Sequence, residues 1–253
     1  MKLLPLRPVL IGLVAVTVLA VSSACGGSSQ TRYDRVFQAP PWTGPESYQY
    51  NLLDQGGHLY GTCILETKPN SEPGRTQLNR LCGNGPNHDD GSVTADANTL
   101  EPMLSSRTIS DDSKNRKTVY TATYEYPSVK LHSDDNGKTH DTVRALPQAD
   151  STSPNPGYYD DDSLLWLVRG IPLTKGFSGT YRNILSGNAQ VTDVTVTVEK
   201  QERIQLPAGD FDTWNVRIDS GSVTQHIWVE SAAPHRMVQA SLESLTYQLA
   251  GPG

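Results

Sequence analysis

Cysteine and positive charge are both scarce in this chain of 253 residues. Its 21 lysines and arginines are outnumbered by 27 aspartates and glutamates, which gives a net charge of −6. Nucleic acids and anionic lipid surfaces are bound through basic patches, so this balance argues against both as binding partners. The three cysteines show no C-x-x-C spacing and no nearby histidine pair, which argues against a redox couple and a zinc site.

Long apolar runs are also absent, except at the amino terminus. Lys2 and Arg7 precede an apolar stretch from Val9 to Val21, and small residues follow at positions 22–24. Crossing a bilayer takes roughly 20 apolar residues, so the stretch is too short and indicates a signal peptide over residues 1–24. Its removal would leave 19 basic and 27 acidic residues, a net charge of −8.

Cys25 follows directly, with Gly-Gly-Ser-Ser-Gln behind it. Small residues before a cysteine and a polar tether after it resemble the lipobox of bacterial lipoproteins. That resemblance implies acyl chains on Cys25 that anchor an exported protein to the outer face of a bacterial membrane, in the cell envelope. Ser22 stands where lipoboxes usually have leucine, and Ser22-x-Ala24 would also suit an ordinary signal peptidase, leaving Cys25 as a free thiol.

Cysteine parity favours lipidation, because it leaves the even pair Cys63 and Cys82. We expect these two to form a structural disulfide. Such a bond would close a loop of about 20 residues and contribute roughly 3 kcal/mol through the unfolded state.

The remaining chain is expected to hold a flexible tether at 25–44 and a single β-rich domain at 45–253. Glycine, proline and polar residues dominate the tether. Phe37 and Trp42 would also allow its second half to lie as an ordered segment along the domain surface.

Strand patterns dominate the domain. Val194, Val196 and Val198 alternate with polar residues, as in a half-buried strand. Turn residues recur at short intervals, which indicates a mainly β protein with an antiparallel sheet. Two polar stretches, 83–99 and 147–157, are expected to be long surface loops.

One short helix is predicted at about 161–169. Asp160 or Asp161 can cap its start, Gly170 is placed for a left-handed cap at its end, and Pro172 stops it. Its length is roughly 14 Å, too short for a membrane span. Because it is apolar nearly all round, we expect it to be buried against the concave face of a curved sheet or to plug the end of that sheet. The adjacent aspartates are then caps at a solvated helix start.

The pattern D-x-x-S-L-L-W-L-V-R-G-I-P-L from Asp160 to Leu173, followed by L-P-A-G-D-F-D-T-W-N-V from Leu206 to Val216, resembles an exported bacterial family. It is the family called domain of unknown function 3108, on a lipobox-type lipoprotein. The resemblance implies a curved antiparallel sheet, as a half-barrel, roll or sandwich, and transfers no catalytic residues.

No catalytic residue, metal ligand or cofactor is predicted, since the six histidines show no metal spacing and no nucleophile or phosphate motif occurs. The expected function is a non-enzymatic module that binds an apolar or amphipathic ligand, such as a lipid, or an envelope protein. The alternatives are an assembly scaffold without a small ligand and, less favoured, a hydrolase. The candidate ligand-facing or packing residues are Leu164, Trp166, Leu167, Trp214 and Trp228.

Overall fold

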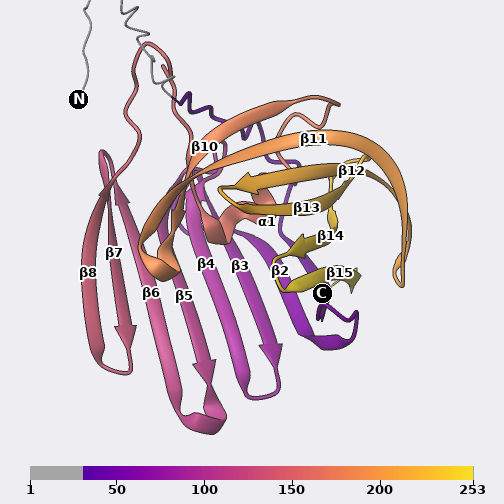
Figure 1. Cartoon of the computed structure of the whole chain (residues 1–253), viewed down its shortest axis with the longest axis horizontal. Helices are drawn as coiled ribbons and strands as arrows, with labels where there is room; N and C mark the ends of the chain where they lie inside the picture. Colours follow the sequence, from indigo (N-terminus) through magenta and orange to yellow (C-terminus); the bar gives the residue numbers. More distant parts are fainter. Residues whose placement is uncertain (1–30, 253) are drawn as a thin grey trace, which may run out of the picture. The chain divides into compact units, whose positions relative to one another are not determined.

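The computed structural model describes residues 31–252, which form one curved sheet of 15 strands that does not close on itself (Figure 1). The mainly β fold predicted from the sequence is confirmed. The first half of the sheet contains β1 (Glu46–Leu53), β2 (Leu59–Pro69), β3 (Arg75–Asn84), β4 (Asn87–Asp96), β5 (Pro102–Asp111), β6 (Arg116–Glu125), β7 (Ser128–Asp135) and β8 (Lys138–Ala145). The second half contains β9 (Tyr158–Asp160), β10 (Ser178–Leu185), β11 (Gln190–Leu206), β12 (Gly209–Ser220), β13 (Val223–Glu230), β14 (Met237–Leu242) and β15 (Leu245–Pro252). The helical segments are α1 (Leu164–Leu167) and the 3-10 turns Asp112–Lys114, Asp161–Ser163 and Ser186–Asn188.

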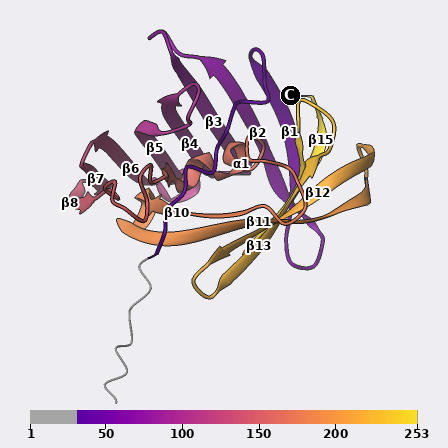
Figure 2. The same ribbon diagram turned by 90° about the horizontal axis from the view of Figure 1, so that it is seen from above.

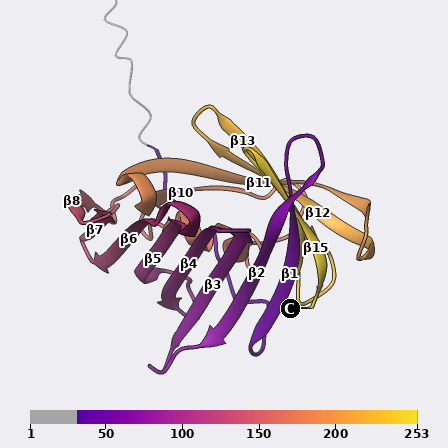
Figure 3. The same cartoon turned by 90° about the horizontal axis from the view of Figure 1, so that it is seen from below.

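Successive strands pair with one another in both halves, and β1 also pairs with β15. Tyr50 of β1 lies opposite Leu249 of β15 in this antiparallel seam, which joins the two halves (Figure 3). The two edges of the sheet are therefore β8 and β9. All pairings are antiparallel except that of β9 with β10.

Local sequence patterns explain most strands. Val194, Val196 and Val198 of β11 are at most 3% exposed, as their alternation predicts. Residues 147–157 form the expected loop between β8 and β9. The other predicted loop, 83–99, is wrong, because most of it is β4, which pairs with β3 and β5. Its inward residues Gly91, Val93 and Ala95 are small, and this masks the strand pattern.

The predicted helix is present as Asp161–Ser163 continued by α1, seven residues in all. Leu165, Trp166 and Leu167 are buried. The indole Nε1 of Trp166 donates a hydrogen bond of 3.0 Å to Thr67 Oγ1 on β2. Figure 2 shows α1 between the two halves of the sheet, so the helix fills the centre of the concave face. No helix of residues 31–252 is long and apolar enough to cross a membrane.

Residues 31–44 lie along the domain rather than away from it. Val36 and Phe37 are 1% and 2% exposed. The backbone N–H of Asp34 donates to Thr180 O at 2.6 Å, and that of Gln38 donates to Gly170 O at 2.8 Å. This corresponds to the ordered segment that the aromatic residues allowed. The rest of the predicted tether, the signal peptide and Cys25 lie outside the described residues.

Gly170 is needed at the end of the helix for a reason that the sequence did not indicate. It does not adopt the left-handed conformation expected of a cap. Instead, a Cβ at this position would collide with the ring of Phe37 and lie 2.6 Å from Ala39 O. The absence of a side chain lets the amino-terminal segment pack onto the helix end.

Candidate ligand-binding site

A cavity of about 440 Å³ lies at the end of the concave face where the β3–β4 and β5–β6 hairpins turn. Ligand pockets typically measure about 300–1,000 Å³, so this one can hold a small ligand. Residues from β1 to β6 and from β15 line it: Leu52, Tyr60, Arg80, Cys82, Gly83, Asn84, Asn87, His88, Asp89, Ile109, Ser110, Asp111, Arg116, Lys117, Thr118, Leu245 and Tyr247.

The lining is divided between apolar and charged residues. Leu52, Leu245 and Tyr247 come from β1 and β15 at the seam, whereas Arg116 and Lys117 come from β6. Ile109 of β5 and Tyr60 of β2 remain 40% and 46% exposed. Exposed apolar side chains inside a concave site offer surface that a ligand can cover.

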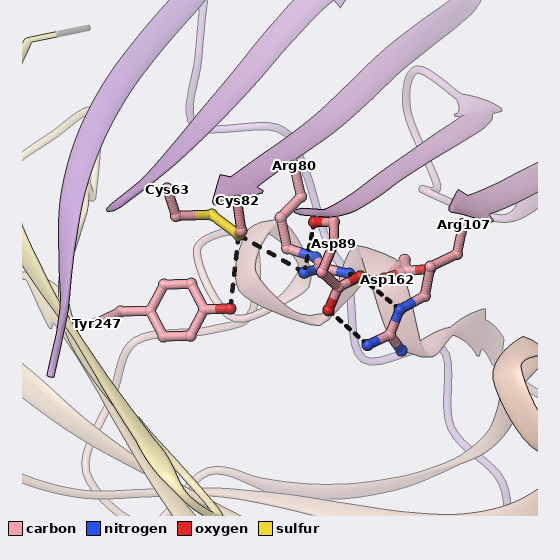
Figure 4. Close-up of a disulfide and its surroundings, with 7 residues drawn as sticks. All are labelled: Cys63, Arg80, Cys82, Asp89, Arg107, Asp162 and Tyr247. Carbon is pink, nitrogen blue, oxygen red and sulfur yellow. Dashed lines mark hydrogen bonds and ion pairs between the residues drawn. A yellow bond between two sulfur atoms is a disulfide. The ribbon is translucent and has the colours of Figure 1, made fainter. Parts of the chain in front are cut away.

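A chain of charged groups starts at the cavity wall, where Arg80 and Asp89 line it, and continues away from the cavity to Arg107 and Asp162 (Figure 4). Arg107 of β5 donates two hydrogen bonds to the Asp89 carboxylate of β4, at 2.8 and 2.7 Å. The Nη2 group of Arg80 on β3 donates to Asp89 Oδ1 at 3.1 Å and to Asp162 Oδ1 at 2.9 Å. Bidentate arginine–carboxylate pairs are rigid and directional, so this network fixes three strands to the helix start.

The charges in this network alter one another's protonation. Burial raises the pKa of Asp89, but hydrogen bonds from Arg107 and Arg80 more than offset it and lower that pKa to about 2. Burial disfavours the charged form of Arg80, yet Asp162 and Asp89 together raise its pKa above the ordinary value. Both groups therefore stay ionised at neutral pH.

Gly91 makes room for the network. It lies on β4 directly opposite Arg80 of β3 and Arg107 of β5. A Cβ there would lie 3.0 Å from Asp162 Oδ1 and 3.3 Å from Arg80 Nη2. A larger residue would have to displace the ion pair.

The aspartates at the helix start are not the solvated group expected from the sequence. Asp160 and Asp162 are 1% and 7% exposed. Asp160 does cap the first turn, since its Oδ1 accepts from Asp162 N at 3.0 Å. Its Oδ2 accepts from Ser105 Oγ and Tyr124 OH, both on the sheet. These partners explain why the carboxylate is buried.

The same environment makes Asp160 and Asp161 weaker acids. Burial raises the pKa of Asp160 to about 6, and the Asp162 charge adds to the effect. Burial and the two neighbouring carboxylates also raise the pKa of Asp161 well above its ordinary value. Asp161 keeps a quarter of its side chain exposed.

Carboxylate oxygens of Asp160, Asp161 and Asp162 lie within 4.8 Å of one another, and this spacing would suit a bound cation. Arg80 and Arg107 already supply positive charge beside them. None of the three lines the cavity. The cluster therefore serves to hold the helix on the sheet, and we assign it neither a metal nor acid–base chemistry.

The residues proposed from the sequence as ligand-facing or packing lie outside the cavity. Trp166 and Leu167 are buried in the core, and Leu164, Trp214 and Trp228 pack against it. Trp228 also donates from Nε1 to Glu202 Oε1 at 2.8 Å. The cavity residues were missed, although the alternation of Leu78, Arg80 and Cys82 places that arginine on the inner face.

The expected disulfide between Cys63 and Cys82 is present beside the cavity. The two residues face each other in the register of β2 and β3. Cys82 Sγ lies 3.6 Å from Arg80 Nη1 and 3.9 Å from Tyr247 OH (Figure 4). The bond thus ties two strands together at the cavity wall.

Fold and site together define a class of protein: an unclosed β meander with an apolar helix in its concave face and an open cavity at one end. The chain belongs to the DUF3108 family of proteins of unknown function, whose model matches residues 85–246. The family resemblance noted in the sequence is thereby confirmed.

Solved structures with a related outline have distant sequences. A β-barrel-like protein of the DUF1849 family from Brucella abortus aligns with 11% identity and a TM-score of 0.46, over 83% of this chain and 97% of that one. A Bacteroides fragilis protein described as exported, with a YmcC-like fold, aligns with 13% identity and a TM-score of 0.31, over 86% and 99%. A Parabacteroides distasonis protein described as a lipoprotein aligns with 11% identity and a TM-score of 0.31, over 88% and 100%. No curated protein matches the chain. These likenesses transfer no function.

Proposed function

We propose that this protein is a non-enzymatic module of the cell envelope that holds the apolar part of an amphipathic ligand in the cavity between β1–β6 and β15. The observation that carries the proposal is the cavity itself. Most of the concave face is filled by α1 and its neighbours, but this end leaves about 440 Å³ free beside exposed Ile109 and Tyr60. Covering such surface favours ligand binding by roughly 25 cal/mol per Å².

The place of this module in the cell is part of the same proposal. The signal-like segment 1–24 and the lipobox-like Cys25 support export and attachment through acyl chains. The acidic balance of the chain supports a membrane contact made by those acyl chains rather than by a basic surface. It also speaks against nucleic acid as a partner.

Binding of a neutral apolar dye, N-phenyl-1-naphthylamine, tests the proposal. Thr31–Gly253 forms a compact unit of its own, so this segment can be used. We expect saturable binding that Ile109→Glu weakens about tenfold, because a carboxylate in the cavity costs roughly 1.4 kcal/mol or more of binding free energy.

Leu104→Glu is the matched control. Leu104 lies on the same strand, is 45% exposed and does not line the cavity. Its replacement should leave dye binding unchanged. Absence of saturable binding, or equal losses in both variants, would show that the cavity is not a ligand site.

A second candidate function is an assembly scaffold without a small ligand, favoured by the edge strand β8. Seven of its eight residues are exposed, and it pairs only with β7. An exposed edge can pair with a strand of another protein. Val143, 59% exposed, offers the test. Cross-linking in membranes should recover a reproducible partner that Val143→Pro abolishes, and recovery of none would exclude this function.

A further inference from the structure

Two cations without partners, consecutive in the sequence, line one end of the cavity. Of the 19 lysines and arginines in residues 31–252, Arg116, Lys117, Lys138 and Lys175 have neither an ion pair nor a side-chain hydrogen bond within the described residues. The first two of these four are consecutive, and both line the cavity. In a chain with an acidic balance, such a concentration of free positive charge marks a place for an anion.

The acidic groups nearby are already engaged. Asp111 lines the same end, but its carboxylate accepts hydrogen bonds from Lys114 Nζ at 2.6 Å and Ser113 Oγ at 2.5 Å. Asp89 is held by Arg80 and Arg107. His88 Nε2 lies 3.7 Å from Asp112, outside hydrogen-bond distance. Consecutive strand residues point to opposite faces, and the register places Arg116 opposite Asp111 on the face of Ile109, and Lys117 opposite Ser110 on the other face. Arg116 therefore faces the cavity without a carboxylate that holds it, and Lys117 adds positive charge at the rim.

The strand order separates these cations from the apolar wall. Leu52 and Tyr60 belong to β1 and β2, and β3, β4 and β5 lie between them and β6. Neighbouring strands lie about 4.8 Å apart, so β2 and β6 are roughly 19 Å apart along the sheet. A ligand that spans the cavity thus meets apolar side chains at one end and positive charge at the other.

We propose that the ligand is an anionic amphiphile with a single alkyl chain, whose carboxylate or phosphate group binds Arg116, with Lys117 adding positive charge at the rim, and whose chain extends across Ile109 toward Leu52 and Tyr60. This inference rests on the proposed function and adds the chemical class of the ligand. A cavity of about 440 Å³ lies in the lower half of the usual range for ligand pockets, which favours one chain over two.

Calorimetry with alkyl compounds of equal chain length tests the sign of the head group. Decyl phosphate, decyl maltoside, decyltrimethylammonium and inorganic phosphate are each titrated into Thr31–Gly253, below their micelle concentrations. We expect decyl phosphate to bind about tenfold more tightly than the maltoside, and the ammonium compound more weakly than both. Raising the salt concentration should reduce the difference.

Variants then locate the anion site. Arg116→Glu/Lys117→Glu should weaken decyl phosphate binding about tenfold or more and leave decyl maltoside unchanged. Lys138→Glu/Lys175→Glu changes the net charge equally at unpaired positions that do not line the cavity, and should leave both ligands unchanged. Arg116→Gln/Lys117→Gln should give an intermediate loss, and thermal unfolding checks that each variant is folded.

The outcomes separate this inference from the proposed function. Equal affinity for all three head groups, or equal losses in the two charge-reversed variants, would overturn the anion site and leave the cavity as a general apolar site. Inorganic phosphate binding as tightly as decyl phosphate would overturn an amphiphile as the ligand. If no alkyl compound binds, the proposed function fails as well.

Discussion

Asp89 is a single carboxylate at the cavity wall that is shared by two guanidinium groups. Replacing it with asparagine leaves Arg80, 9% exposed, with Asp162 alone. We expect Asp89→Asn to lower the free energy of unfolding by about 2–3 kcal/mol, below the 3–5 kcal/mol of fully buried pairs because Asp89 keeps a third of its surface exposed. Urea denaturation at pH 7 measures the loss.

The exposed pair of Arg203 and Asp210 provides the control for this prediction, since its side chains are 64% and 41% exposed. Asp210→Asn should cost about 0–1 kcal/mol. The folded-state pKa of Asp89 is lowered to about 2, so its contribution is present above the ordinary pKa and is lost as pH falls toward 2. An Asp89→Asn loss no larger than that of the control would contradict the network.

Asp160 has the opposite pH dependence, because its folded-state pKa is raised to about 6. The stability that Asp160 contributes by binding a proton in the folded state is fully present below the ordinary pKa of aspartate and is lost as pH rises through 6. We expect the difference in unfolding free energy between the wild type and Asp160→Asn to fall between about pH 4 and pH 6 and then level off. Parallel stability curves for the two proteins across this range would refute the raised pKa.

The end of the helix depends on close contact between the backbone at Gly170 and the segment 31–44. Because a Cβ on Gly170 would meet Phe37 and Ala39 O, Gly170→Ala must displace the amino-terminal segment. We expect a loss of about 1–3 kcal/mol in stability, typical of overpacking, and faster trypsin cleavage at Arg32 and Arg35. Gly44→Ala, in the same segment with no atom within 4 Å of its Cβ, should change neither. Resistance to trypsin equal to that of the wild type would mean that the segment can shift without detaching.

For a single strand, the local sequence pattern predicts the element when only one face is buried and the residues on that face are large. β11 satisfies this condition and was predicted. The helix at 161–167 is buried on most sides and was predicted instead from its start and stop signals, Asp160 and Pro172. β4 does not satisfy the condition, because its inner face carries Asp89, Gly91 and Ala95. Arginines from β3 and β5 lie opposite Gly91 and fill the space beside it. A polar inner residue looks like a loop residue until its partner is known.

At the scale of the whole molecule, the pairing of distant strands and the cavity that it completes have no local sequence pattern. The sequence indicated an antiparallel sheet, and the family motif indicated its curvature, but nothing in either predicted that β1 pairs with β15. The cavity requires that pairing, because Leu245 and Tyr247 line it together with residues of β1–β6. Its residues could not be grouped before the strand order was known.

The seam between β1 and β15 also has a consequence for how the chain reaches this structure. β1 is synthesised first among the strands and its partner last, whereas β1 to β8 can pair as consecutive hairpins while they emerge. Contacts between distant parts of a chain carry the greatest entropic cost and form late. Until β15 docks, β1 presents an open edge that can pair with other molecules. β15 therefore covers the open edge of β1, and a chain cut before Leu245 would leave that edge free to pair with other molecules.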